Sequence, residues 1–201
     1  YEATQQNPER TVAVKVLRAE IATPELEQRF RIESRLLARL QHPGIAHVYG
    51  ADVAEVDGAP LPYIAMELVE GARTIQRFAD DEHLDRNQRI ELMTLVCDAV
   101  HHGHQRGVIH RDLKPGNILV DSSGRPKLID FGVARTVDPD ASSFRTEAGV
   151  ILGTLQYMSP EHCNDARDLD VRSDVYSLGV VLYELLCDRL PYDLSGVPLP
   201  Q

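Results

Sequence analysis

The sequence contains few cysteines, fewer basic than acidic residues, and no long uninterrupted apolar run. Cys97, Cys163 and Cys187 are odd in number and far apart, which argues against a disulfide framework and favours reduced thiols in a cytoplasmic setting. A net charge of -10 disfavours electrostatic binding to nucleic acid or anionic lipid. The longest apolar candidate, residues 175–186, is interrupted by polar and charged residues, so no membrane span is predicted.

The remaining composition is that of a globular protein. With 201 residues, of which 43% are hydrophobic and 26% charged, the chain can bury a sizeable core in one or two domains. We find no internal repeat and no low-complexity segment. Strand patterns dominate the first part of the chain and helical periods the later part, which predicts an α+β fold.

Chemically capable residues gather in the segment His-Arg-Asp-Leu-Lys-Pro-Gly-Asn at 110–117 and in Asp-Phe-Gly at 130–132. Asp112 can accept a proton from a hydroxyl nucleophile, and Lys114 can offset charge on a transferred phosphate. Asn117 and Asp130 supply the oxygen ligands that Mg²⁺ prefers. Either short motif alone is weak, but their order is the one that phosphoryl transfer uses.

The residues between the two motifs predict a β-hairpin. The short apolar runs 118–120 and 127–129 flank Asp-Ser-Ser-Gly at 121–124, which is typical of a turn. Asn117 then lies just before one strand, and Asp130 lies at the end of the next. The hairpin therefore brings both candidate metal ligands to one edge.

Lys15 lies within the apolar strand run 12–16, where a buried ammonium group needs a partner. A helix is predicted to start with Thr23 as the N-cap and Pro24 as the first helical residue. Its apolar stripe, which includes Glu33, is formed by Leu26, Phe30, Leu37 and Leu40. We expect Glu33 to pair with Lys15, the alternative being a local pair with Arg29 or Arg31.

Further strands are predicted around 48–49 and over 62–66, with a turn at 57–58 between them. Residues 67–71 break the strand pattern and are predicted to connect two lobes, the alternative being an ordinary domain connector. Asp85 and Gln88 form a capping box for a helix whose apolar face is predicted to be Ile90, Met93, Cys97 and Val100. The nearby histidines His101, His102 and His104 lack a matching second ligand pair for zinc.

Together these motifs resemble the protein kinase superfamily over the whole chain, most closely the bacterial serine/threonine kinases of Hanks type. The matching segments are 12–15, Glu33, 66–67, 110–117, 130–132, 153–154, 159–161 and 174–179. The resemblance implies a bilobal kinase-like α+β fold, with a small antiparallel β lobe carrying one helix and a larger, mainly helical lobe. It divides the chain into a small lobe at 1–66, a hinge at 67–71 and a large lobe at 72–201.

The resemblance also implies a nucleotide site. Lys15 would contact the ATP phosphates, with Glu33 holding it in place. The base would be sandwiched and bounded by Ala13, Leu119, the gatekeeper Met66, and backbone groups of Glu67 and Val69. Asp130 would complete the ATP site.

The implied activity is transfer of the ATP γ-phosphoryl group to serine or threonine hydroxyls of proteins, with Asp112 as the base. Mg²⁺ would be held by Asn117 and Asp130. Arg111 beside Asp112 is typical of kinases whose activation segment, here 130–161, is ordered by phosphorylation. The candidate phosphosites for autophosphorylation in trans are Thr146 first, then Ser142 and Ser143, which could instead be ordinary loop hydroxyls.

Internal supports are implied as well. His110 would stack on Phe131, together with Leu37 and Val48. Asp174 would accept backbone hydrogen bonds from the 110–111 turn, or else would only stabilise the positive end of a helix. The helix over 173–187 is apolar around most of its circumference, which predicts burial on all sides.

Two departures from the family pattern lead us to expect a fragment of a longer kinase, which could carry a membrane anchor elsewhere. The family's glycine-rich loop would precede Tyr1, and the helices that complete the large lobe would follow the last residues. We expect weak or no activity from the isolated chain. A pseudokinase scaffold is disfavoured by the intact Lys15, Asp112 and Asp130, and a small-molecule kinase by the segment 153–161.

Overall fold

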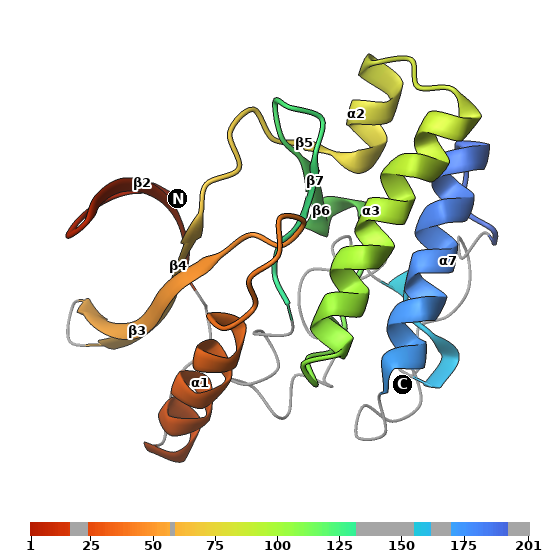
Figure 1. Cartoon of the computed structure of the whole chain (residues 1–201). Helices are drawn as coiled ribbons and strands as arrows, with labels where there is room; N and C mark the ends of the chain where they lie inside the picture. Colours follow the sequence, from red (N-terminus) through yellow and green to blue (C-terminus); the bar gives the residue numbers. More distant parts are fainter. Residues whose placement is uncertain (17–23, 57–58, 132–154, 162–169, 193–201) are drawn as a thin grey trace.

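The structure is a computed structural model that describes residues 1–16, 24–56, 59–131, 155–161 and 170–192. The predicted α+β class is confirmed, since strands dominate the first part and helices the later part (Figure 1). The strands are β1 (Glu2–Gln6), β2 (Glu9–Val16), β3 (Val48–Val56), β4 (Ala59–Glu67), β5 (Arg73–Thr74), β6 (Ile118–Val120) and β7 (Pro126–Leu128). The helices are α1 (Pro24–Leu37), α2 (Ile75–Asp81), α3 (Arg86–His104), the 3-10 turn η1 (Pro115–Asn117) and α7 (Val171–Cys187).

The first sheet has the strand order β1-β2-β4-β3, and each neighbouring pair is antiparallel. In its register Ala13 lies opposite Met66 and Lys15 lies opposite Ile64. Residues directly opposite on antiparallel strands point to the same face, so these four side chains share one face of the sheet. In Figure 1 helix α1 lies beside this sheet, against β3.

Helix α1 begins at Pro24, as the sequence predicts. Phe30 and Leu37 are buried, and so is Leu40 in the turn that follows the helix. The side chains of Leu26 and Glu33 lie outside the described residues. The predicted apolar stripe is therefore confirmed at its three described positions.

Helices α3 and α7 run side by side in the second part of the molecule (Figure 1). The predicted capping box of α3 is present: Asp85 Oδ1 accepts from the backbone N–H of Gln88 at 3.0 Å, and Gln88 Oε1 accepts from that of Asp85 at 2.8 Å. The predicted apolar face is half right. Met93 and Val100 are buried, whereas Ile90 and Cys97 are exposed, because the buried stripe also runs through Leu92, Val96, Ala99 and Gly103 toward β7 and α7.

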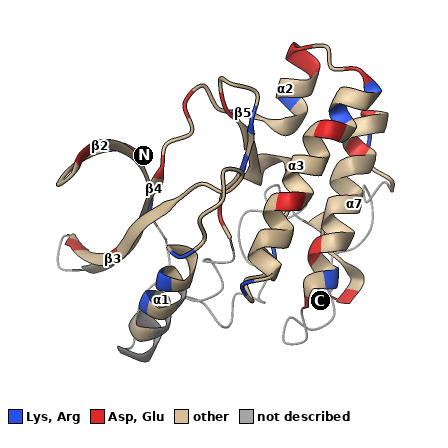
Figure 2. Cartoon of the chain, in the orientation of Figure 1, with Lys and Arg blue, Asp and Glu red and all other residues tan. Residues whose placement is uncertain are grey.

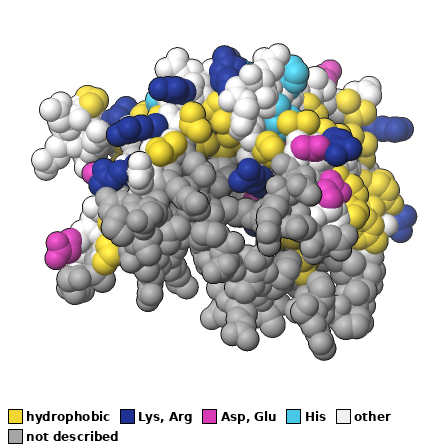
Figure 3. All heavy atoms as spheres, turned by 90° about the horizontal axis from the view of Figure 1, so that it is seen from below, with side chains coloured by type: hydrophobic (Ala, Val, Ile, Leu, Met, Phe, Trp, Pro, Cys, Tyr) yellow, Lys and Arg dark blue, Asp and Glu magenta, His cyan; other side chains and the backbone are white. Residues whose placement is uncertain are grey.

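Helix α7 is not buried on all sides, so that prediction is wrong. Val180, Val181 and Leu185 are buried, but Val175 is 59% exposed. None of the described residues covers this side, where an apolar groove of about 370 Å³ runs between α3 and α7. In Figure 3, seen from below, hydrophobic side chains are visible over this region of the molecule.

Acidic and basic side chains are interspersed along α2, α3 and α7 (Figure 2). These described helices thus carry charges of both signs. None of the described helices combines the length and the apolarity needed to cross a membrane.

Candidate active site

The loop between α3 and β6 places three predicted residues in contact. Asn117 Nδ2 donates to Asp112 Oδ2 at 2.9 Å and to the backbone oxygen of Asp112 at 2.7 Å. Lys114 Nζ lies 2.9 Å from the same Oδ2. Two donors therefore hold one carboxylate oxygen of Asp112 and fix its orientation, and within the described part of the chain no hydrogen bond occupies its second oxygen.

The predicted hairpin brings Asn117 and Asp130 together. Strands β6 and β7 are antiparallel, and the backbone N–H of Ile129 donates to the backbone oxygen of Asn117 at 3.0 Å. Asp121 Oδ1 accepts from the N–H groups of Ser123 and Arg125 and so closes the turn. The two candidate metal ligands thus leave the same end of one short hairpin.

The residues at this site fit a divalent cation. The amide nitrogen of Asn117 donates to two oxygens of Asp112, so the amide oxygen is the group that remains to bind a cation. Asp130 has a backbone φ of 64°, a left-handed conformation that costs energy in a residue with a Cβ and is found at functional sites. Amide and carboxylate oxygens are the donors that Mg²⁺ favours.

Among the described residues, Lys15 forms an ion pair with Asp130. Lys15 Nζ lies 2.7 Å from Asp130 Oδ2, so a strand of the first sheet contacts the segment that follows β7. The pair predicted from the sequence was Lys15 with Glu33, whose side chain lies outside the described residues. That pairing stays a prediction.

Asp174 on α7 holds the 110–117 loop through hydrogen bonds to its backbone. Its carboxylate, 1% exposed, accepts from the backbone N–H groups of His110 at 2.8 Å and Arg111 at 2.9 Å, which confirms the predicted contact. His104 Nε2 adds a contact at 2.7 Å that the sequence analysis missed. The carboxylate helps to hold Arg111 at a φ of 68°, one residue before Asp112.

His110, the first residue of the 110–117 loop, is buried and packs against Phe131. The two rings lie 4.6 Å apart at their centroids, as the resemblance implied. Burial lowers the pKa of His110, although the nearby carboxylates of Asp174 and Asp112 oppose that shift. The imidazole is therefore neutral, with Nε2 donating to the backbone oxygen of Ile129 at 3.0 Å.

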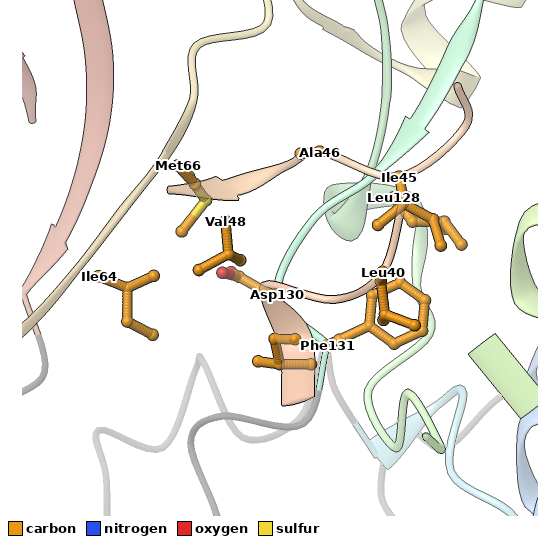
Figure 4. A pocket seen from close by; sticks show the side chains of 10 residues that line it. Leu40, Ile45, Ala46, Val48, Ile64, Met66, Leu128, Asp130 and Phe131 are labelled. Carbon is orange, nitrogen blue, oxygen red and sulfur yellow. The ribbon is translucent and has the colours of Figure 1, made fainter. Parts of the chain in front are cut away.

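A small apolar pocket lies behind Met66 and Asp130 (Figure 4). Leu37, Val48 and Phe131 line it, so these three members of the predicted internal stack lie around one small cavity. The cavity is about 20 Å³, room for no more than a water molecule. It is a packed interior rather than a nucleotide site.

The residues expected around the nucleotide base lie on both sheets. Ala13 and Met66 are opposite each other on β2 and β4, and Val69 follows in the connecting segment, with Met66 and Val69 both buried. Leu119 lies on β6 of the second sheet.

Glu67 makes contacts that the sequence analysis did not anticipate. Lys127 Nζ on β7 lies 2.7 Å from Glu67 Oε1, and the backbone N–H of His47 donates to Glu67 Oε2 at 3.1 Å. A sequence signal was available, because Lys127 is a charged residue at the start of the apolar run 127–129, as Lys15 is a charged residue within the run 12–16.

The candidate phosphosites Thr146, Ser142 and Ser143 lie outside the described residues. Arg111, which would bind such a phosphate, has a buried Nε without a hydrogen-bond partner in the part of the chain that the structure describes.

The site thus brings the carboxylates of Asp112 and Asp130, the amide of Asn117 and two lysines together where the two sheets meet, an arrangement that fits phosphoryl transfer. In comparison with known protein families, the protein kinase domain matches residues 1–197. The chain therefore belongs to the protein kinase family, and the kinase fold and family predicted from the sequence are confirmed. Protein kinases use ATP with a divalent metal ion and act on proteins.

The chain is similar to curated bacterial kinases. It is 45% identical over 184 residues to serine/threonine-protein kinase PknB of Mycobacterium leprae. It is 42% identical over 184 residues to PknB of Mycobacterium tuberculosis. It is 38% identical over 185 residues to a probable PknB of Corynebacterium glutamicum. These matches cover 91%, 91% and 92% of this chain, but only 29%, 29% and 28% of the relatives.

Proposed function

We propose that this chain transfers the γ-phosphoryl group of ATP to serine and threonine hydroxyls of proteins. The observation that carries the proposal is the orientation of the Asp112 carboxylate, one oxygen of which is held by Asn117 and Lys114. Asn117 and Asp130 leave the same end of the β6–β7 hairpin. The names of the similar relatives support serine and threonine as acceptors.

Each side chain has a defined role in this reaction. The free oxygen of Asp112 accepts the proton of the attacking hydroxyl, while Lys114 stabilises negative charge that develops beside it. Asn117 and Asp130 would hold Mg²⁺, which when bound neutralises charge on the phosphates. Lys15 moves from Asp130 to the phosphates, with Glu33 as its proposed support.

The nucleotide base would lie between the two sheets. In this arrangement Ala13 forms the roof, Leu119 the floor and Met66 the back wall. The N–H of Glu67 already donates to the backbone oxygen of His47 at 2.8 Å, so its carbonyl would meet the base, together with backbone groups of Val69. Residues 1–66 then form the small lobe, 67–71 the hinge, and 72–201 the large lobe.

Phosphorylation of the activation segment would regulate the site. A phosphate on Thr146, or on Ser142 or Ser143, would pair with Arg111, whose buried Nε is available. Autophosphorylation in trans would supply that phosphate. The test is Thr146→Ala: loss of phosphate at this position by mass spectrometry and a lower transfer rate are expected, and unchanged phosphate content and rate would refute the proposal.

The setting and the ion are proposals too. The three widely spaced cysteines favour a cytoplasmic setting for this chain. The oxygen-only donor set favours Mg²⁺ over a thiophilic metal.

The main experiment measures phosphate transfer from labelled ATP to casein, with Mg²⁺ or with EDTA. In keeping with the weak activity expected of the isolated chain, the wild-type chain is expected to label serine and threonine slowly, in a reaction that requires the metal ion. Asp112→Asn keeps the shape and the contact with Lys114 but removes the base, so a loss of about 100-fold or more is expected. Equal activity of Asp112→Asn and wild type would refute the base role, and ATP binding without any transfer would favour a scaffold.

A further inference from the structure

The ion pair between Glu67 and Lys127 joins two segments that are distant in sequence and that lie next to residues of the proposed base site. Glu67 is the last residue of β4, and Lys127 lies in the middle of β7. The Lys127 side chain is 15% exposed and that of Glu67 27%, so the pair is shielded from water on most sides. A pair in this setting interacts more strongly than one on the open surface.

Each partner is coupled by strand register to one wall of the proposed base site. On the roof side, Glu67 lies opposite Val12, and the preceding residue, Met66, lies opposite Ala13. On the floor side, Lys127 lies directly opposite Leu119 in the β6–β7 ladder. The ion pair therefore connects the strand pair that holds Ala13 with the strand pair that holds Leu119.

The segment before β3 reinforces this connection. The Glu67 carboxylate accepts from the N–H of His47, and the Glu67 N–H donates back to the oxygen of His47. The same segment bonds to β7, because the N–H of Ala46 donates to the oxygen of Leu128 at 2.9 Å and the N–H of Leu128 donates to the oxygen of Gly44 at 2.8 Å. Glu67 is thus tied to β7 twice, through Lys127 and through residues 44–47.

We propose that Glu67 and Lys127 are positioning residues that set the separation between Ala13 and Leu119 and thereby the affinity for the nucleotide base. This inference rests on the proposed ATP-dependent function. Neither charged group has to touch the reacting phosphate. The pair therefore acts on ATP binding and leaves the phosphoryl-transfer step nearly unchanged.

Four substitutions in the whole chain separate charge from shape. Lys127→Met removes the charge at similar length, and Lys127→Arg keeps it. Glu67→Gln removes the charge but keeps an oxygen that can accept from His47. Arg73→Met is the matched control, because Arg73 lies on strand β5 of the same sheet as Lys127 and forms ion pairs with Asp81 and Glu82.

Affinity for a non-hydrolysable ATP analogue with Mg²⁺ is measured by calorimetry, beside KM and kcat for ATP. Lys127→Met and Glu67→Gln are each expected to weaken binding and raise KM about tenfold, with kcat within about twofold of wild type. The double variant is expected to bind no more weakly than either single variant, because the two substitutions remove one shared interaction. Lys127→Arg is expected to bind nearly as wild type does, and Arg73→Met to lower only the melting temperature.

Additive effects of the two substitutions would overturn the inference. So would wild-type affinity in variants that only melt earlier, or an equal loss in Arg73→Met. Binding and transfer are scored separately: a chain that binds the analogue but transfers no phosphate defeats the proposed function while the pair is still tested by binding. A wild-type chain that binds no analogue refutes both.

Discussion

Lys15 Nζ and Asp130 Oδ2 form an ion pair of 2.7 Å that joins the first sheet to the end of the β6–β7 hairpin. The side chains are 34% and 22% exposed, so water screens the pair and its net contribution to stability is about 0–1 kcal/mol. Its importance lies in position, because in the proposed function Lys15 contacts the phosphates and Asp130 holds the metal ion. Function and stability should therefore respond differently when the pair is removed.

Lys15→Met tests this separation. Loss of the ammonium group removes phosphate positioning, so we expect kcat/KM for ATP to fall about 100-fold or more. The melting temperature should change by only about 2 °C, because the pair contributes little to folding. Steady-state kinetics and thermal unfolding measure the two effects.

The control for Lys15→Met is Arg77→Met, which removes an exposed cation on α2, where Arg77 pairs with Asp81. Arg77→Met should leave both measurements near wild type. A large drop in melting temperature for Lys15→Met with nearly normal kinetics would contradict the prediction.

Asp174→Asn should strongly destabilise the protein. The carboxylate is buried and accepts three hydrogen bonds, from His110, Arg111 and His104. An asparagine offers one acceptor oxygen and turns an N–H group toward a donor, so we expect a loss of about 2–4 kcal/mol in the free energy of unfolding. Denaturant unfolding followed by circular dichroism measures it.

Asp170→Ala serves as the comparison for Asp174→Asn. Asp170 is the N-cap of the same helix, accepts from the N–H of Arg172 at 2.8 Å, and has a half-exposed side chain. Its loss should cost less than that of Asp174. Equal losses would show that Asp174 acts only through the helix end, the alternative left open by the sequence.

The sequence predicted those parts of the site that depend only on neighbouring residues in the chain. The hairpin that carries Asn117 and Asp130 follows from two apolar runs and a turn, and the capping of α3 follows from Asp85 and Gln88 alone. The Glu67–Lys127 pair could not be placed in the same way, because it depends on how two sheets approach each other. Lys127 stands at the start of the apolar run 127–129, but its partner lies 60 positions earlier in the chain, so no local pattern links the two.

The rotation of a helix about its axis was also beyond local patterns. In α3 both Ile90 and Val96 are apolar, and helical periodicity alone does not say which of them faces the core. The structure exposes Ile90 and buries Val96, because packing decides which side is covered. Likewise the apolar circumference of α7 suggested complete burial, although Val175 is exposed. Hydrophobicity predicts that a face can be buried, whereas burial itself depends on what lies against it.

Tyr157→Phe should loosen the end of the activation segment. The Tyr157 hydroxyl donates to Glu184 Oε2 on α7 at 2.7 Å, and Ser177 Oγ donates to the Tyr157 backbone oxygen at 2.7 Å. Burial, followed by the contact with Glu184, raises the pKa of Tyr157, so the hydroxyl stays protonated and keeps donating. We expect a loss of about 1–2 kcal/mol in unfolding free energy, since Glu184 loses a donor.

The matched control for Tyr157→Phe is Tyr1→Phe, since the Tyr1 side chain is 89% exposed. That variant should unfold within about 0.5 kcal/mol of wild type. If both variants behave alike in denaturant unfolding, the Tyr157–Glu184 contact does not stabilise the chain.

His110 should make the protein less stable in mild acid. Burial lowers the pKa of His110 in the folded state below the ordinary value of 6.5. The unfolded chain therefore binds a proton at pH values where the folded chain does not, and stability falls as the pH is lowered from about 7 through 6.5 until the folded state is protonated as well. Above about pH 7 this group is neutral in both states and adds no pH dependence.

The variant His110→Phe removes that titration and keeps an aromatic ring against Phe131. Its unfolding free energy, measured by denaturant at pH 7.5, 6.5 and 5.5, should fall less steeply than that of wild type, by at most about 1.4 kcal/mol per pH unit. His101→Gln, which changes an exposed histidine on α3, should keep the wild-type slope. The carboxylates of Asp112, Asp130 and Asp174 and the ring of His104 remain in both variants, so parallel profiles for His110→Phe and wild type would show that His110 is not the group that titrates.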